Sequence, residues 1–328
     1  MFEKRLKELS RKIGEKEKSK FYILTHKKHK REVYFQNKQR AINFLKYKLT
    51  DSTSKKFKTI KSILYLFIKL RFAQLFLKKI KLSSRFGEVI FVGGKINSFD
   101  LGKKEVLSFP LRKSEEKELI RSKRFQSRVA KKGFAPEVLE MNKNVPYSRE
   151  KMFEVFQEGS RYKIFKKLMK FYGFMGIEKI SIKEYVERLR RELKKQGIKN
   201  DFIYNKLDSL SKEKIKLLST TLHGDFAKEN TLVKDDGEIV FIDWHPYEGL
   251  ITNGIINYFR STEDTQSSFY FKKIIKAFPK EVQKNIRIYL ILSEIDLIVK
   301  KNRKPSWAIK KIKNIRKPSR KNPNQRQL

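Results

Sequence analysis

Cysteine is absent from this 328-residue sequence. That absence excludes disulfide bonds, thiolate zinc sites and cysteine nucleophiles. Acidic residues are scarce, because 36 Asp and Glu stand against 79 Lys and Arg, for a formal net charge of +43. A long apolar run is also missing: the most apolar stretch, residues 62–77, carries Lys69 and Arg71 in its middle, whereas a membrane-spanning helix needs about 20 nearly uncharged residues.

What is present indicates a folded chain of about two domains. Hydrophobic residues make up 39% and aromatic residues 12% of the sequence, which is too apolar for general disorder. The first 18 residues are charged throughout and contain no apolar core of a signal peptide. We therefore expect a cytoplasmic protein that could also bind peripherally to the inner face of a membrane.

The positive charge is concentrated at the two ends. Residues 1–82 hold 25 Lys and Arg but 6 Asp and Glu, and residues 300–328 hold 12 Lys and Arg without an acid. We expect 1–82 to be a basic, partly helical region and 300–328 to be a basic, disordered tail. Either the ends bind an anionic partner, such as an acidic membrane surface, or they are a solvated basic surface. Nucleic acid is the less supported partner, since no RNA-binding or zinc-finger spacing occurs.

Basic and bulky apolar residues interleave most densely in residues 55–82. A basic amphipathic helix on a membrane surface has this pattern. A helix that packs on the next domain with its lysines outward has it too.

The middle of the chain changes from a β pattern to a helical one. Short runs separated by turn residues predict strands, a charged run begun by Ser114 predicts a helix, and the chain after Gly159 is mostly helical to residue 300, with one β-hairpin. The predicted strands are 88–92, 96–101, 105–111, 137–141 and 152–157, and the predicted helix is 114–132. The fold class is therefore α+β with two lobes, at 83–159 and 160–299.

The candidate catalytic and metal-binding residues lie in and beside this hairpin. Asp236-Gly237 is typical of a two-residue type I′ turn, and this register would set Asn230 opposite Asp243. Directly opposed side chains lie about 4.5–5.5 Å apart at Cβ, so an amide and a carboxylate there can share one Mg²⁺. Asp225 lies in the loop that enters the hairpin.

The residues His223-Gly224-Asp225, Asn230 and Asp243-Trp244 together resemble the catalytic core of the aminoglycoside phosphotransferase and choline kinase group. They are also similar to the H-R-D-x-x-x-x-N and D-F-G elements of protein kinases. The resemblance implies a bilobal protein-kinase-like fold, with a small β-rich N-lobe and a helical C-lobe, that uses ATP and Mg²⁺. It implies that Asp225 orients or deprotonates an acceptor hydroxyl, that Asn230 and Asp243 hold the metal, and that His223 braces the loop.

The same resemblance implies a set of nucleotide-binding residues. A turn would cover the phosphates, a helix acid would pair with a phosphate-binding lysine, and residues 152–159 would form the adenine hinge. The residues are Gly93, Gly94 and Lys95 in the turn, Glu118 (or Glu115) in the helix, and Glu154 and Phe156 in the hinge. Lys228 would lie either near the transferred phosphate or at the surface.

One departure concerns the lysine that ends the third strand in kinases. Ser108 occupies that position, and Arg112, Lys104 or Lys95 could substitute for it. The acceptor expected from the resemblance, which extends to lipopolysaccharide-core sugar kinases, is a sugar or a lipid-linked saccharide, with ATP or GTP as donor. A non-catalytic kinase-like module that binds a nucleotide or a partner is the alternative, and a basic nucleic-acid-binding protein is the third.

Overall fold

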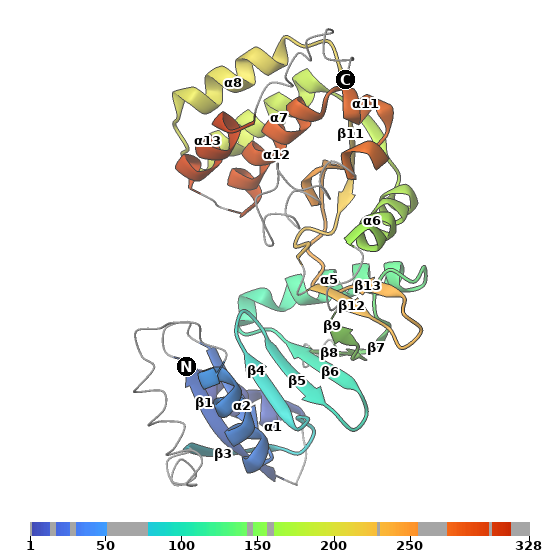
Figure 1. Cartoon of the computed structure of the whole chain (residues 1–328). Coiled ribbons are helices and arrows are strands. Elements are labelled where there is room, and N and C mark those ends of the chain that lie inside the picture. Colours follow the sequence, from blue (N-terminus) through green and yellow to red (C-terminus); the bar gives the residue numbers. More distant parts are fainter. Residues whose placement is uncertain are drawn as a thin grey trace. The chain divides into compact units, whose positions relative to one another are not determined.

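A computed structural model describes residues 2–13, 18–26, 31–50, 78–142, 147–155, 161–227, 230–254, 274–301 and 304–315. Within it the chain divides into two compact units, Met1–Phe153 and Glu154–Leu328. Figure 1 shows the elements of each unit.

The first unit is built on an eight-stranded antiparallel sheet with the order β3-β1-β2-β4-β5-β6-β8-β7. The strands are β1 (Lys18–His26), β2 (Arg31–Phe35), β3 (Lys78–Ser83), β4 (Val89–Val92), β5 (Ile96–Asp100), β6 (Glu105–Phe109), β7 (Val138–Asn142) and β8 (Tyr147–Lys151). The helices are α1 (Phe2–Ile13), α2 (Lys38–Thr50) and α5 (Glu116–Ala130), with the short 3₁₀ helix η3 (Lys113–Glu115) before α5.

One face of this sheet is apolar. Side chains alternate between the two faces of a strand, so Ile96 of β5 lies on the same face as its cross-strand partner Phe109 of β6. Both are fully buried and pack in one cluster with Leu6 and Leu9 of α1. The three- and four-residue spacing of the apolar residues in α1 produces that buried stripe.

The opposite face is polar in its middle. The register pairs Asn97 with Ser108 and Ser108 with Ser148, so the three side chains share a face, and Glu150 follows two residues after Ser148. Helix α5 contacts β7 and β8. We call Asn97, Ser108, Ser148 and Glu150 the polar stripe of the first unit.

The predicted strands and helix between residues 88 and 141 are confirmed within about two residues, because turn residues bound each of them. Strand β8 was missed, since its residues YSREK are mostly polar and lack an apolar signature. The expected boundary after residue 82 is not a boundary, because β1–β3 continue the sheet that starts at β4. Residues 78–82, expected to be helical, belong to β3, and residues 51–77 lie outside the described residues.

The second unit combines helices with two small antiparallel sheets, β10-β11-β14 and β13-β12-β9. The strands are β9 (Glu154–Val155), β10 (Glu178–Ser181), β11 (Lys216–Leu222), β12 (Thr231–Val233), β13 (Ile239–Phe241) and β14 (Tyr247–Leu250). The helices are α6 (Arg161–Met175), α7 (Ile182–Lys195), α8 (Asp201–Ser211), α11 (Lys280–Lys284), α12 (Ile286–Lys301) and α13 (Pro305–Lys313). The predicted α+β class, with a β-rich first part and a helical second part, is confirmed.

Local signals start these helices. Ser181 Oγ accepts a hydrogen bond from Glu184 N at the start of α7, and Asn200 Oδ1 accepts one from Ile203 N at the start of α8. The expectation of a disordered tail from residue 300 is wrong for α13. This helix has Pro305 in its first turn and buries Ala308. Residues 316–328 of that tail lie outside the described residues.

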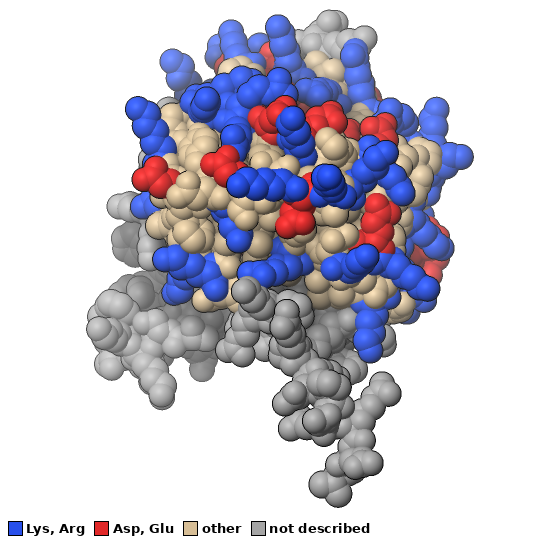
Figure 2. Space-filling view, turned by 90° about the horizontal axis from the view of Figure 1, so that it is seen from above, with Lys and Arg blue, Asp and Glu red and all other residues tan. Residues whose placement is uncertain are grey.

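Basic side chains outnumber acidic ones on one face of the molecule. Figure 2 shows Lys and Arg spread over the visible face, with fewer Asp and Glu among them. Among the helices that the structure describes, none has both the length and the apolar character that a membrane crossing requires.

Helix α12 of the second unit carries a buried acid. Asp296 of α12 is 1% exposed and accepts a 2.7 Å hydrogen bond from Asn253 Nδ2. Burial raises the pKa of Asp296 to about 6, against the opposing charges of Lys300 and Arg188. Because this pKa exceeds its unfolded value, the folded state loses stability at this group as the pH rises from about 4 to 6.

Replacing Asp296 by Asn is therefore expected to stabilise the protein increasingly as the pH rises through that window. The shift corresponds to about 3 kcal/mol at most. Thermal unfolding of both proteins at pH 4.5 and pH 7 measures it, with Asp201→Asn, an exposed acid of α8, as the control. A pH-independent difference between Asp296→Asn and the wild type would contradict the expectation.

Gly87 lies against the backbone of strand β5. Its N–H donates to Ser98 Oγ at 2.8 Å, and a Cβ on it would lie 2.2 Å from the Phe99 carbonyl oxygen. We expect Gly87→Ala to lower the unfolding midpoint by several degrees, since overpacking costs about 1–3 kcal/mol. Gly102→Ala is the control, because its Cβ would meet nothing nearer than 3.6 Å; equal midpoints for the two variants would refute this reasoning.

Candidate active site

Two strand pairs bracket the predicted catalytic residues. Strand β11 ends at Leu222, which pairs with Tyr247 of β14, and the His245 N–H then donates to the His223 carbonyl at 2.9 Å. On the other side, β12 and β13 pair, and the Ile242 N–H donates to the Asn230 carbonyl at 3.0 Å. The loop with Asp225 and the loop with Asp243 therefore both run between the same two ladders.

The hairpin turn differs from the prediction by one residue. The register pairs Leu232 with Val240 and Val233 with Ile239, and the Lys234 N–H donates to the Glu238 carbonyl. The loop thus has three residues, Asp235 to Gly237, with Gly237 at φ +79°. The predicted two-residue turn is wrong, and Asn230 lies opposite Ile242 rather than Asp243. The Asp236 side chain, which accepts from the Glu238 N–H, supports this longer loop.

The side-chain amide of Asn230 is hydrogen-bonded to Asp225, the predicted base. Its Nδ2 donates to the Asp225 carbonyl at 2.8 Å and to Asp225 Oδ2 at 3.3 Å. The Asn230 N–H donates to the Ala227 carbonyl at 3.1 Å. Because the NH₂ group faces Asp225, Oδ1 is on the opposite side of the amide. The Asn230 side chain therefore holds Asp225 through its NH₂ group, and its Oδ1 is directed away from Asp225.

His223 is a neutral brace. It is fully buried against Trp244, with ring centroids 4.2 Å apart, and against Phe226. Burial lowers its pKa to about 3, although the carboxylates of Asp243 and Asp225 act in the opposite direction. The Asp225 N–H donates to His223 Nδ1 at 3.3 Å, so that nitrogen is an acceptor. The buried ring thus holds the backbone of the loop at Asp225.

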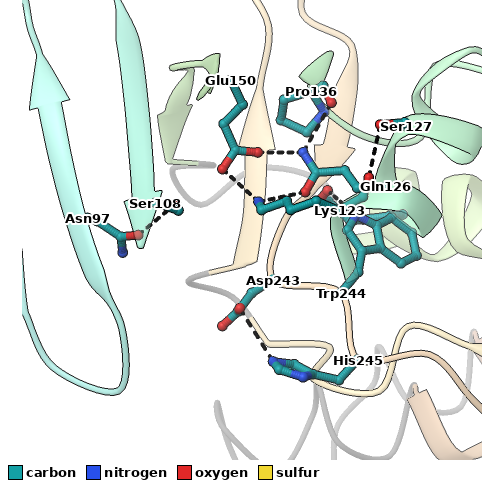
Figure 3. Close-up of polar contacts among 11 residues, drawn as sticks. Asn97, Ser108, Lys123, Gln126, Ser127, Pro136, Glu150, Asp243, Trp244 and His245 are labelled. Atoms are coloured by element: carbon teal, nitrogen blue, oxygen red, sulfur yellow. Dashed lines mark hydrogen bonds and ion pairs between the residues drawn. The ribbon is translucent and has the colours of Figure 1, made fainter. Parts of the chain in front are cut away.

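Each of the two loops contains one residue with a positive φ. Gly224 has φ +88°, and a Cβ on it would lie 1.8 Å from the His245 carbonyl oxygen. Asp243 adopts φ +63°, which is costly for a residue with a side chain. The Asp243 carboxylate lies 3.4 Å from His245 Nε2 (Figure 3). Thus the strain is concentrated at Asp243, one of the two predicted metal ligands.

The predicted phosphate turn is a tight turn. Residues 93–95 connect β4 to β5, and the Gly93 N–H donates to the Lys95 carbonyl at 3.0 Å. Gly94 has no atom within 4 Å of the position of a Cβ, so the turn is open on that side.

The proposed substitutes for the strand lysine are less well placed. The Arg112 side chain is 71% exposed and faces Glu115 at the start of α5. Lys104 and Glu118 are exposed. Ser108 is buried and its Oγ lies 2.9 Å from Asn97 Oδ1.

The sequence interpretation missed a buried cluster in this unit. Lys123 Nζ of α5 donates to Glu150 Oε1 of β8 and to Gln126 Oε1, each at 2.8 Å. The three-residue spacing of Lys123, Gln126 and Val129, all buried on one side of α5, is the signal that could have identified the helix residues. Glu150 gave no signal, because its strand was not recognised.

The hinge segment starts the second unit. Glu154 is exposed and lies in β9, which pairs with β12 of the hairpin, so that Val233 faces Glu154. Phe156 and Lys228 lie outside the described residues.

No protein-family model and no curated protein matches the chain. Solved structures do. Choline kinase LicA from Streptococcus pneumoniae is 12% identical and has a TM-score of 0.45, over 68% of this chain and 88% of that one. A macrolide 2′-phosphotransferase from Brachybacterium faecium is also 12% identical, with a TM-score of 0.43, over 68% and 89%. The ADP-bound aminoglycoside phosphotransferase APH(2″)-Ib is 13% identical, with a TM-score of 0.42, over 68% and 89%.

These three proteins are small-molecule kinases and phosphotransferases, 12–13% identical to this chain with TM-scores of 0.42–0.45. The function proposed for this chain therefore has to be argued from its own residues.

The donor set suits magnesium. Asn230 Oδ1 and the Asp243 carboxylate are oxygen donors, and Mg²⁺ is usually held by one or two such groups together with substrate phosphates. In the described ranges, no group of three or more His, Asp or Glu side chains is placed to hold a metal. Two oxygen-bearing side chains fit a metal that substrate phosphates also hold.

Gly224 and Gly237 make a matched pair for testing the loop. Both have positive φ, but a Cβ on Gly237 would meet no atom within 4 Å. We expect Gly237→Ala to cost about 1–2 kcal/mol. Gly224→Ala is expected to cost clearly more, because it also drives the two loops apart. Thermal unfolding of both variants measures the difference, and equal losses would show that the contact with His245 is unimportant.

Proposed function

We propose that this protein is an ATP- and Mg²⁺-dependent phosphotransferase that transfers the γ-phosphoryl group to an acceptor hydroxyl. In this proposal Asp225 orients the hydroxyl and takes its proton, while Asn230 and Asp243 hold the metal. His223 positions the loop. Gly93, Gly94 and Lys95 cover the phosphates, and the hinge around Glu154 and Phe156 receives the adenine.

The observation that carries the proposal is the contact between Asn230 and Asp225. An amide that donates to both the carbonyl and the carboxylate of Asp225 fixes the base relative to a metal ligand. The Ile242 N–H, bonded to the Asn230 carbonyl, places the next residue, Asp243, in the same loop system. These contacts support the proposal because a base and metal ligands held in place before the substrate binds lower the cost of reaching the reactive geometry.

The reaction requires little covalent work from the protein. The acceptor oxygen forms a bond to the γ-phosphorus, the bond from that phosphorus to the bridging oxygen breaks, and the hydroxyl proton passes to Asp225. A bound Mg²⁺ supplies neutralisation of the phosphate charge. Asp225 is half-buried and bonded by Asn230, so it presents a carboxylate in a fixed orientation.

For the acceptor we propose a sugar or saccharide hydroxyl. The net charge of +43 and the basic face in Figure 2 favour an acceptor that itself carries anionic groups, because a positive surface raises the local concentration of anions. ATP hydrolysis with a panel of neutral sugars, phosphorylated saccharides and amino alcohols tests this preference.

We expect Asp225→Asn to lower kcat at least about 100-fold with a smaller effect on the KM for ATP, because a general base contributes about 10²–10⁴-fold. Asp201→Asn, an exposed acid at the start of α8, is the control for the same chemical change. Phosphate release or acceptor phosphorylation is the measurement. Equal activity of Asp225→Asn and the wild type would refute the role of Asp225.

The alternative of a non-catalytic nucleotide-binding module has a different outcome. Ser108 in place of the strand lysine is the observation that favours it. That module would show thermal stabilisation by ATP without turnover on any acceptor, and the stabilisation would survive in Asp225→Asn.

A further inference from the structure

A lysine and a glutamate form a buried ion pair in the first unit. The lysine is on the helix and the glutamate on the strand, the reverse of the arrangement expected from the kinase resemblance. Lys123 is 2% exposed and comes from helix α5, whereas Glu150 is 6% exposed and comes from strand β8. Gln126 is fully buried, accepts from Lys123 and donates to both Glu150 and the Pro136 carbonyl. Figure 3 shows the three side chains converging.

Stability alone is a weak reason for this pair. Removing two charges from water costs several kcal/mol each, and a buried pair is often no better than an apolar one of similar volume. The cluster also interrupts a helix face whose remaining buried member is Val129. A function that needs an ammonium at this place explains the pair better.

The position of the cluster is informative. Glu150 shares its sheet face with Ser108, the residue found where a phosphate-binding lysine was expected. The Ser148 hydroxyl between them is fully buried and has no hydrogen-bond partner among the residues that the structure describes. The polar stripe therefore leads from Ser108 directly to the carboxylate that holds Lys123.

Two lysines act on the Glu150 carboxylate. Burial alone would raise the pKa of Glu150, but Lys123, Gln126 and the charge of Lys95 together lower it. Lys95 belongs to the turn between β4 and β5. A cation of the helix and a cation of the turn therefore both act at this end of the polar stripe, and two cations favour an anionic ligand such as a polyphosphate.

We propose that Lys123 is the cation that contacts the nucleotide phosphates, in place of the absent strand lysine, and that Glu150 positions it from the sheet. The pair is then charge-swapped: the helix supplies the lysine and the strand supplies the acid. This inference rests on the proposed function and concerns residues of the first unit alone.

The test replaces both charges at once, in Lys123→Met with Glu150→Leu, so that no unpaired charge stays buried. We expect the double variant to fold, to lose at least 10-fold in ADP affinity and to raise the KM for ATP. Leu6→Ala is the control, because Leu6 is fully buried in the core on the other face and should reduce stability without changing ADP affinity. ADP affinity is measured by calorimetry.

A labelling experiment on the wild type covers the case in which the double variant does not fold. An acyl-phosphate derivative of ATP transfers its acyl group to a nearby lysine: an amide bond forms to Nζ, the bond from the acyl carbon to the phosphate oxygen breaks, and ATP leaves as the amine loses a proton to water. We expect mass spectrometry to find the acyl group on Lys123, with protection by excess ATP.

The outcomes separate the two proposals. A wild type that neither binds ADP nor turns over ATP overturns the proposed function, and the inference with it. A wild type that binds ADP, with a folded double variant of unchanged affinity or with ATP-protected labelling at lysines other than Lys123, overturns the inference alone.

Discussion

The Asn230 side chain is the contact on which the candidate site depends. Its amide restrains Asp225, and the backbone carbonyl of the same residue accepts from the N–H of Ile242, the residue before Asp243. A short loop between two strands would otherwise adopt many conformations. Here a few hydrogen bonds, each worth about 1 kcal/mol, remove that freedom for both loops together.

The aromatic cluster beneath the loops gives these hydrogen bonds a rigid support. Trp244 is fully buried, and its Nε1 donates to the Phe241 carbonyl at 2.8 Å. His223 and Phe171 pack against its ring. This packing also buries His223 and keeps its imidazole neutral.

The sequence was a good guide where local chemistry decides the structure. Turn residues bounded strands β4 to β6, and Ser114 with its neighbouring acids marked the start of α5. The motif from His223 to Asp243 was recognised because its members lie within about twenty residues. The register of the hairpin could not be obtained in this way, since Asp235-Asp236-Gly237 and Asp236-Gly237 are both acceptable loops and the choice depends on Lys234 meeting Glu238.

Two features depend on distant residues and were out of reach. Lys123 and Glu150 pair across 27 positions, and neither is unusual in its own segment. The strands of residues 18–35 and 78–83 looked like a separate basic region because their lysines are exposed, although their apolar partners complete the same sheet.

That shared sheet limits how the protein can be shortened. A version that starts at residue 83 would retain every residue of the proposed reaction but would uncover Ile90, Val92 and Ile96, which are fully buried in the intact protein. It would also leave the backbone of β4 without its neighbour β2. An open, apolar edge strand pairs readily with other chains, so strands β1 to β3 protect the rest of their own sheet from aggregation.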